Sequence, residues 1–212
     1  MTNDKAVRSK GITFELSLRK ECLLAAMTTT EAVRWTIADL ELFPEDGKHY
    51  EIIDGELFVT RAPHWKHQEV TGNVYSKLQT WSRQTGLGRA AIAPGIIFSA
   101  TDSVIPDVVW ASNQRLEECL DESGHLTDAP ELVVEVLSKS KKDRQRDLEL
   151  KLKLYSHQGV QEYWTCDRYK QEVRVYRREQ AILKLVITLF AHDTLITPLL
   201  PGFSCMVEEL FR

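Results

Sequence analysis

With 212 residues, the chain is long enough to bury a substantial core, and a single domain is the simplest count. Its composition, 43% apolar and 27% charged with a net charge of −4, is ordinary for a soluble globular protein and excludes general attraction to polyanions, so any contact with nucleic acid requires a local basic patch. No apolar run approaches the roughly 18 residues that suggest a membrane span, and the four scattered cysteines form neither a C-x-x-C pair nor a disulfide framework, which favours a reducing cytoplasm.

The first 29 residues differ from the rest of the chain. They mix acidic and basic side chains, and their longest apolar run, residues 22–27, is too short for the core of a signal peptide. Met27 and the threonines after it resemble a natural chain start. We therefore expect residues 1–29 to be a loosely ordered extension and residues 30–212 to form one domain.

Three elements are predicted in the first part of this domain. Residues 36–42 have the pattern of a short helix capped by Thr36. The pair Asp54-Gly55 lies between two short apolar strands, which predicts a two-residue β-hairpin. Apolar residues recur at helical spacing over residues 65–83, which predicts an amphipathic helix.

Strands and one further helix follow. We predict strands over residues 95–99, 107–111 and 131–138, a helix over 141–157 that Gly159 ends, and a β-rich remainder at 162–166, 172–177 and 183–190. The fold class is therefore α/β (α+β), with a mixed β-sheet flanked by helices.

An acid inside an apolar strand is the strongest functional signal. Glu135 lies within the β-branched run of residues 132–137, where an ionised carboxylate loses its hydration and requires a cation, a metal or a proton. Asp107 begins a similar run directly after Pro106. Two carboxylates on neighbouring strands, with the carbonyl of Val136 as a third oxygen, predict a site for Mg²⁺ or Mn²⁺. The alternative is that Glu135 pairs with a buried cation as a structural acid.

Other candidate residues lie before and after these strands. Glu56 begins a predicted strand and is a third candidate acid, and His67 is near the start of the amphipathic helix. In the helix after Glu135, Lys151 is one turn from both Asp147 and Tyr155, so all three can share one face. A lysine there can stabilise an attacking hydroxide, although an exposed ion pair and a core tyrosine are equally compatible with the spacing.

One segment concentrates positive charge beside this site. Residues 138–146 carry five cations and one acid, and the candidate nucleic-acid contacts are Lys139, Lys141, Lys142, Arg144 and Arg146. Phosphate contacts require such a patch, although a charged run is also typical of a solvated surface.

Taken in order, several motifs resemble one known family. The central motifs are Pro106-Asp107, residues 131–138 around Glu135, the set of Asp147, Lys151 and Tyr155, and Gly159 to Trp164. The match extends before them to Asp54-Gly55-Glu56 and His67, and after them to residues 198–202. From about Thr36 to Phe211 the chain resembles the Uma-type restriction endonuclease family, a branch of the PD-(D/E)XK nuclease superfamily.

The resemblance implies a restriction-endonuclease-like core and Mg²⁺-dependent hydrolysis of DNA phosphodiester bonds. Asp107 and Glu135 then become the metal carboxylates, Glu56 the early acidic position and Lys151 the motif lysine. The superfamily pattern has a lysine two residues after the second acid, where this chain has Leu137, so the lysine comes from the following helix; Lys139 is the weaker candidate. A homodimer is compatible with cutting both strands.

Two other readings remain open at this point. The first is a nuclease fold that binds nucleic acid or a protein partner without turnover, and the second is a metal-free buried ion pair between Glu135 and Lys151.

Overall fold

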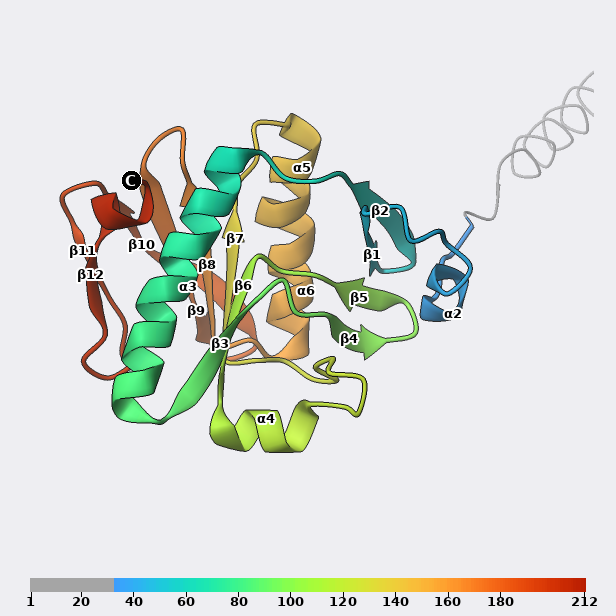
Figure 1. Ribbon diagram of the computed structural model, residues 1–212, viewed down its shortest axis with the longest axis horizontal. Helices are drawn as coiled ribbons and strands as arrows, with labels where there is room; N and C mark the ends of the chain where they lie inside the picture. Colours follow the sequence, from blue (N-terminus) through green and yellow to red (C-terminus); the bar gives the residue numbers. More distant parts are fainter. Residues whose placement is uncertain (1–32) are drawn as a thin grey trace, which may run out of the picture. The chain divides into compact units, whose positions relative to one another are not determined.

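The computed structural model describes residues 33–212, of which residues 34–212 form one compact unit (Figure 1). The expected extension over residues 1–29 lies outside the described residues. Among the helices of the described part, none is long and apolar enough to cross a membrane.

The first predicted elements are a short helix and a hairpin that belongs to a small four-stranded sheet. Helix α2 (Ile37–Leu40) begins after Thr36, and the hairpin of β1 (His49–Ile53) and β2 (Glu56–Thr60) turns at Asp54 and Gly55. Both turn residues have positive φ, 50° and 73°, as the predicted two-residue turn requires. Strands β5 (Asp102–Val104) and β4 (Ile96–Ser99) complete the sheet in the order β2-β1-β5-β4.

The main sheet has six strands in the order β10-β9-β8-β7-β6-β3. They are β3 (Gly88–Ile92), β6 (Val108–Ser112), β7 (Leu132–Val136), β8 (Glu162–Asp167), β9 (Glu172–Glu179) and β10 (Ile182–Phe190). Strands β7 and β8 are parallel and every other neighbouring pair is antiparallel. The predicted mixed sheet is therefore confirmed. Strand β3 was not predicted, because its residues alternate too weakly to mark a strand.

Both faces of this sheet are covered. Helix α3 (Trp65–Thr85) covers one face of the sheet. Its residues Val70, Val74, Leu78 and Trp81 share a core with the even-numbered residues of β7. Leu154 and Tyr155, from the helical segment after β7, pack on the other face against the odd-numbered Val133. Figure 1 shows these two helical layers on either side of the central strands. Strand β7 is thus buried on both faces, as its apolar run predicted.

The helical segment after β7 is not one regular helix. It comprises α5 (Lys141–Gln145), a π-helical segment η1 (Arg146–Leu150) and α6 (Lys151–Gln158). The amide of Lys151 donates to the carbonyl of Arg146, five residues back, which widens this turn. Gly159, with φ of 102°, ends the segment as predicted.

The remaining elements lie at the edges. Helix α4 (Asn113–Cys119) follows β6, and β11 (Thr194–Ile196) pairs with β12 (Ser204–Met206) before the 3-10 turn η2 (Val207–Leu210). The last of these contribute Leu195, Cys205, Val207 and Leu210 to the core under α3.

Candidate active site

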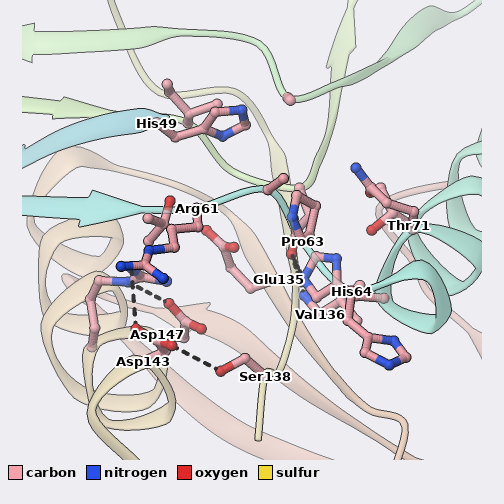
Figure 2. A pocket seen from close by; sticks show the side chains of 18 of the residues that line it. His49, Arg61, Pro63, His64, Thr71, Glu135, Val136, Ser138, Asp143 and Asp147 are labelled. Carbon is pink, nitrogen blue, oxygen red and sulfur yellow. Dashed lines mark hydrogen bonds and ion pairs between the residues drawn. The ribbon is translucent and has the colours of Figure 1, made fainter. Parts of the chain in front are cut away.

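A pocket of about 840 Å³ opens where the first hairpin, the start of α3, the ends of β6 and β7, the α5–α6 segment and the β8–β9 turn meet. Figure 2 shows it from close by, with Glu135 and Asp147 among its lining side chains. Its ionisable lining residues are His49, Glu51, Arg61, His64, His67, Asp107, Glu135, Lys139, Asp143, Arg146, Asp147, Lys151, Arg168 and Tyr169.

Adjacent strands carry the two predicted carboxylates into this pocket. Strands β6 and β7 are paired with Val108 opposite Val134, and one further step in this register leads to Asp107 and Glu135. The Asp107 Oδ2 atom accepts a hydrogen bond from the amide of Val136 at 2.7 Å. The antiparallel pairing therefore explains why acids 28 positions apart in the sequence line one pocket.

Lys151 joins two buried acids. Its Nζ atom lies 2.8 Å from Glu135 Oε1 and 2.8 Å from Glu51 Oε1, and it is 1% exposed. The Tyr155 hydroxyl donates to the same Glu135 oxygen at 3.1 Å. The structure thus brings Glu135, Lys151 and Tyr155 together, as the helical spacing allowed.

Burial and charge act in opposite directions here. Burial raises the pKa of Glu135 well above its ordinary value, the Lys151 ammonium opposes that rise, and the charge of Asp107 adds to it. Burial alone lowers the pKa of Lys151, but Glu135 and Glu51 raise it by more, so the amine stays protonated.

The early acid differs from the prediction. Glu56 is exposed at the start of β2, opposite Ile53, and does not line the pocket. Glu51 on β1 points inward instead, is 3% exposed, and accepts the amide of Ile105 at 2.8 Å in addition to the Lys151 ammonium. The signal was present in the sequence, since Glu51 precedes Ile52 and Ile53 in an apolar strand, just as Glu135 is enclosed by valines.

Asp147 forms a second ion pair beside the first. Its Oδ1 atom lies 2.9 Å from Arg146 Nε, and Arg146 also approaches Glu51 at 3.7 Å. Burial raises the pKa of Asp147, while Lys151 and Arg146 lower it. We call the following residues the ionic cluster: Glu51, Asp107, Glu135, Arg146, Asp147 and Lys151.

The ionic cluster contains four carboxylates and two cations, an excess of two negative charges when all are ionised. Among residues 33–212, no three His, Cys, Asp or Glu side chains form a ready-made metal site. Asp107 and Glu135, with the Val136 carbonyl, match the coordination preference of Mg²⁺. This ion binds one or two carboxylates and completes its coordination shell with water and substrate oxygens. The hard oxygen donors therefore fit a divalent cation.

His67 lies beside Asp107. Its Nε2 atom is 3.3 Å from Asp107 Oδ2, and its ring lines the pocket from the first turn of α3. Burial lowers the pKa of His67, but the hydrogen bond and charge of Asp107 raise it by more, with a further contribution from the Val136 carbonyl, so the net pKa is raised.

The predicted basic residues divide into two groups. Lys139 and Arg146 line the pocket, although Arg146 is engaged by acids of the ionic cluster. Arg144 points to the buried Asp167, 2.7 Å away, and Lys141 and Lys142 are exposed outside the pocket lining.

Further basic residues that the sequence did not single out line the pocket, among them His49 on β1 and three others. Arg61 follows β2, His64 precedes α3, and Arg168 lies in the β8–β9 turn with its guanidinium 4.5 Å from the centre of the exposed Tyr169 ring. They come from separate segments, which is why no local run of charge marked them. The pocket therefore has an acidic interior with cations from several segments around it.

A mixed sheet whose adjacent central strands bring two carboxylates beside a buried lysine defines a restriction-endonuclease-like protein. The chain belongs to the Uma2 family: the family model, described as "Putative restriction endonuclease", matches residues 37–208. A solved structure, described as a "putative nuclease belonging to DUF820" from Anabaena variabilis ATCC 29413, aligns with a TM-score of 0.66 at 21% identity, covering 83% of this chain and 97% of that chain. No curated protein sequence matches the chain. These comparisons confirm the predicted family and fold.

Proposed function

We propose that this protein is an endonuclease that hydrolyses DNA phosphodiester bonds and depends on Mg²⁺, which Mn²⁺ can replace. The observation that carries the proposal is the convergence of Asp107, Glu135 and Lys151 in one pocket of a nuclease-like fold. Family membership supports the reaction class.

Asp107 and Glu135 would hold the ion, which when bound supplies a Lewis acid that polarises the phosphodiester and acidifies a water. The Lys151 ammonium is positioned to stabilise negative charge that develops on the attacking oxygen and the phosphorus centre. Glu51 and Tyr155 act through their neighbours: Glu51 orients the ammonium, and the Tyr155 hydroxyl orients the Glu135 carboxylate.

The cations of the pocket favour a phosphate backbone as the ligand. Arg61, Lys139 and Arg168 surround an interior that is otherwise acidic, so a polyanion contacts the outer part of the pocket while one phosphate reaches the carboxylates. A two-fold dimer would present one such site to each strand of a duplex, which sedimentation measurements can establish.

The metal-free alternative rests on the direct contact between Lys151 and Glu135. That reading also expects Asp107 to point away, yet Asp107 lines the same pocket, and the ionic cluster carries more carboxylates than cations. A second carboxylate that opens on the same pocket therefore favours the metal site over a closed ion pair.

Substitution of the carboxylates tests the proposal. Asp107→Asn and Glu135→Gln should abolish Mg²⁺-dependent cleavage while the circular dichroism spectrum stays native, and Glu51→Gln should reduce cleavage strongly. Glu56→Gln is the matched control on the same hairpin and should cleave as wild type. Cleavage at the wild-type rate by both Asp107→Asn and Glu135→Gln would refute the site.

The same assay separates the non-catalytic alternative. A protein that binds without turnover would show salt-sensitive DNA affinity and no cleavage with either Mg²⁺ or Mn²⁺.

A further inference from the structure

Buried polar atoms without a hydrogen-bond partner are concentrated at the pocket. Within residues 33–212 there are four such side-chain atoms, namely His67 Nδ1, Thr71 Oγ1, Thr165 Oγ1 and Arg168 Nε. Three of the four belong to residues that line the pocket. His67 and Thr71 are one turn apart on α3 and therefore share a face. Figure 2 includes Thr71 among the lining residues.

Thr71 is the most telling of these. It is 2% exposed, and a buried hydroxyl that makes no hydrogen bond destabilises the folded protein. Hydroxyls in the middle of a helix usually bond to the carbonyl four residues back. Two others in α3 do so: Ser82 donates to the Leu78 carbonyl at 2.8 Å and Thr85 to the Trp81 carbonyl at 3.0 Å. The Thr71 hydroxyl has no partner in the described residues, although the backbone around it is equally helical.

Valine has nearly the same shape and would leave no unsatisfied hydroxyl at this position. A buried polar group without a partner requires a physical explanation, and for one that lines a pocket a ligand that accepts its hydrogen bond is such an explanation. The pocket around Thr71 supplies the charge for one class of ligand, since Arg61, Lys139 and Arg168 line it and the amino-terminal turn of α3 reaches it through His67 and Gln68. Both features favour an anion with acceptor oxygens.

We infer that the Thr71 hydroxyl donates a hydrogen bond to a non-bridging phosphate oxygen of the bound nucleic-acid strand. The inference rests on the proposed function and adds a substrate-binding residue on α3, across the pocket from the ionic cluster's helical segment.

The test compares Thr71→Val with wild type in two independent measurements. The first is affinity for a deoxynucleoside 3′,5′-bisphosphate in the presence of Mg²⁺, measured by calorimetry. Thr71→Val should bind about tenfold more weakly, as the loss of one hydrogen bond to a charged group predicts, and Thr71→Ser should retain the wild-type affinity. The second is the urea midpoint, which should be unchanged or higher in Thr71→Val.

Thr85→Val is the matched control on the same helix. Its hydroxyl bonds to the backbone outside the pocket, so this variant should keep the wild-type affinity. Wild-type affinity in Thr71→Val overturns the inference, whatever its midpoint, as does a wild-type protein that does not bind the bisphosphate. A wild type that binds the bisphosphate and cuts no DNA defeats the proposed function and leaves the Thr71 contact standing.

Discussion

Replacing Lys151 with methionine tests the ionic cluster most directly. The Nζ atom lies 2.8 Å from a carboxylate oxygen on each of Glu51 and Glu135, and all three side chains are nearly fully buried. At an effective dielectric constant near 20, one such pair is worth about 6 kcal/mol before desolvation. Removal of one partner of a buried pair costs about 3–5 kcal/mol net, because the other charge stays buried without compensation.

We therefore expect Lys151→Met to lower the free energy of unfolding by about 3–5 kcal/mol at neutral pH. For a urea slope near 2 kcal/mol/M, the urea midpoint should fall by about 1.5–2.5 M. Tryptophan fluorescence reports the transition, because Trp110 and Trp164 are buried. Lys153→Met, at an exposed position of the same helix, is the control and should change stability by less than about 0.5 kcal/mol.

The pH dependence of this deficit has a defined sign. Loss of the ammonium raises the pKa of Glu135 further, because Lys151 is the group that lowers it. A carboxyl group whose pKa is higher in the folded state than in the unfolded state binds its proton more tightly when the protein is folded, which stabilises the fold at low pH. This stabilisation is lost as the pH rises from the ordinary pKa of 4.5 through the pKa of the folded state. The deficit of Lys151→Met should thus shrink as the pH is lowered. A variant with the wild-type midpoint at neutral pH would refute the buried ion pairs.

Two further predictions separate the basic residues by role. Lys139 lines the pocket and is a proposed phosphate contact. Lys139→Ala should therefore weaken DNA binding in the presence of Ca²⁺ and reduce the salt slope of log K by about 1, as measured by fluorescence anisotropy. Arg144→Ala should leave that slope unchanged, because Arg144 does not line the pocket. It should lower the free energy of unfolding by about 1–3 kcal/mol, because it removes the partner of buried Asp167. Burial raises the pKa of Asp167, but the hydrogen bond from Arg144 and two backbone amides lower it by more, so the stabilisation is present above the ordinary value of 3.8 and is lost as pH falls through the folded value. The deficit of Arg144→Ala should accordingly disappear in acid; a deficit that is independent of pH would contradict this assignment.

The elements that depend on local patterns could be predicted from the sequence. Asp54-Gly55 predicted the hairpin because few residues adopt the positive φ values of its turn, and the spacing of Val70, Val74 and Leu78 predicted α3 because that period fits only a helix. The two apolar runs predicted β6 and β7 as buried strands, and the structure pairs them as the proposed metal site assumed.

The missing parts of the site depend on contacts between distant segments. Glu51 and Glu56 lie on the same face of the hairpin, because Glu51 is opposite Phe58 and Glu56 is opposite Ile53. They differ in burial because β1 also pairs with β5, while β2 is at the sheet edge and Glu56 is next to the turn. Arg144 belongs to the most basic segment of the chain, yet the depth of Asp167 at the end of β8 determines its role. The neighbours of Arg144 do not encode its partner, whereas the apolar residues after Glu51 are a local signal that the choice of Glu56 overlooked.

The displaced lysine shows how one chemical requirement can be met from another element. A lysine at position 137 would be two residues beyond Glu135, on the same face of the strand, but Leu137 is buried there and its amide pairs with the Cys166 carbonyl. The ammonium reaches Glu135 from the helical segment instead, immediately after the π-helical turn of residues 146–150. Asp147 and Lys151 are both buried beside this turn, as their spacing of four residues allows, while Leu150 between them is 37% exposed. Polar groups take inward positions of a helix that packs on an apolar sheet. Packing alone does not favour this arrangement, whereas the proposed site for a charged substrate requires it.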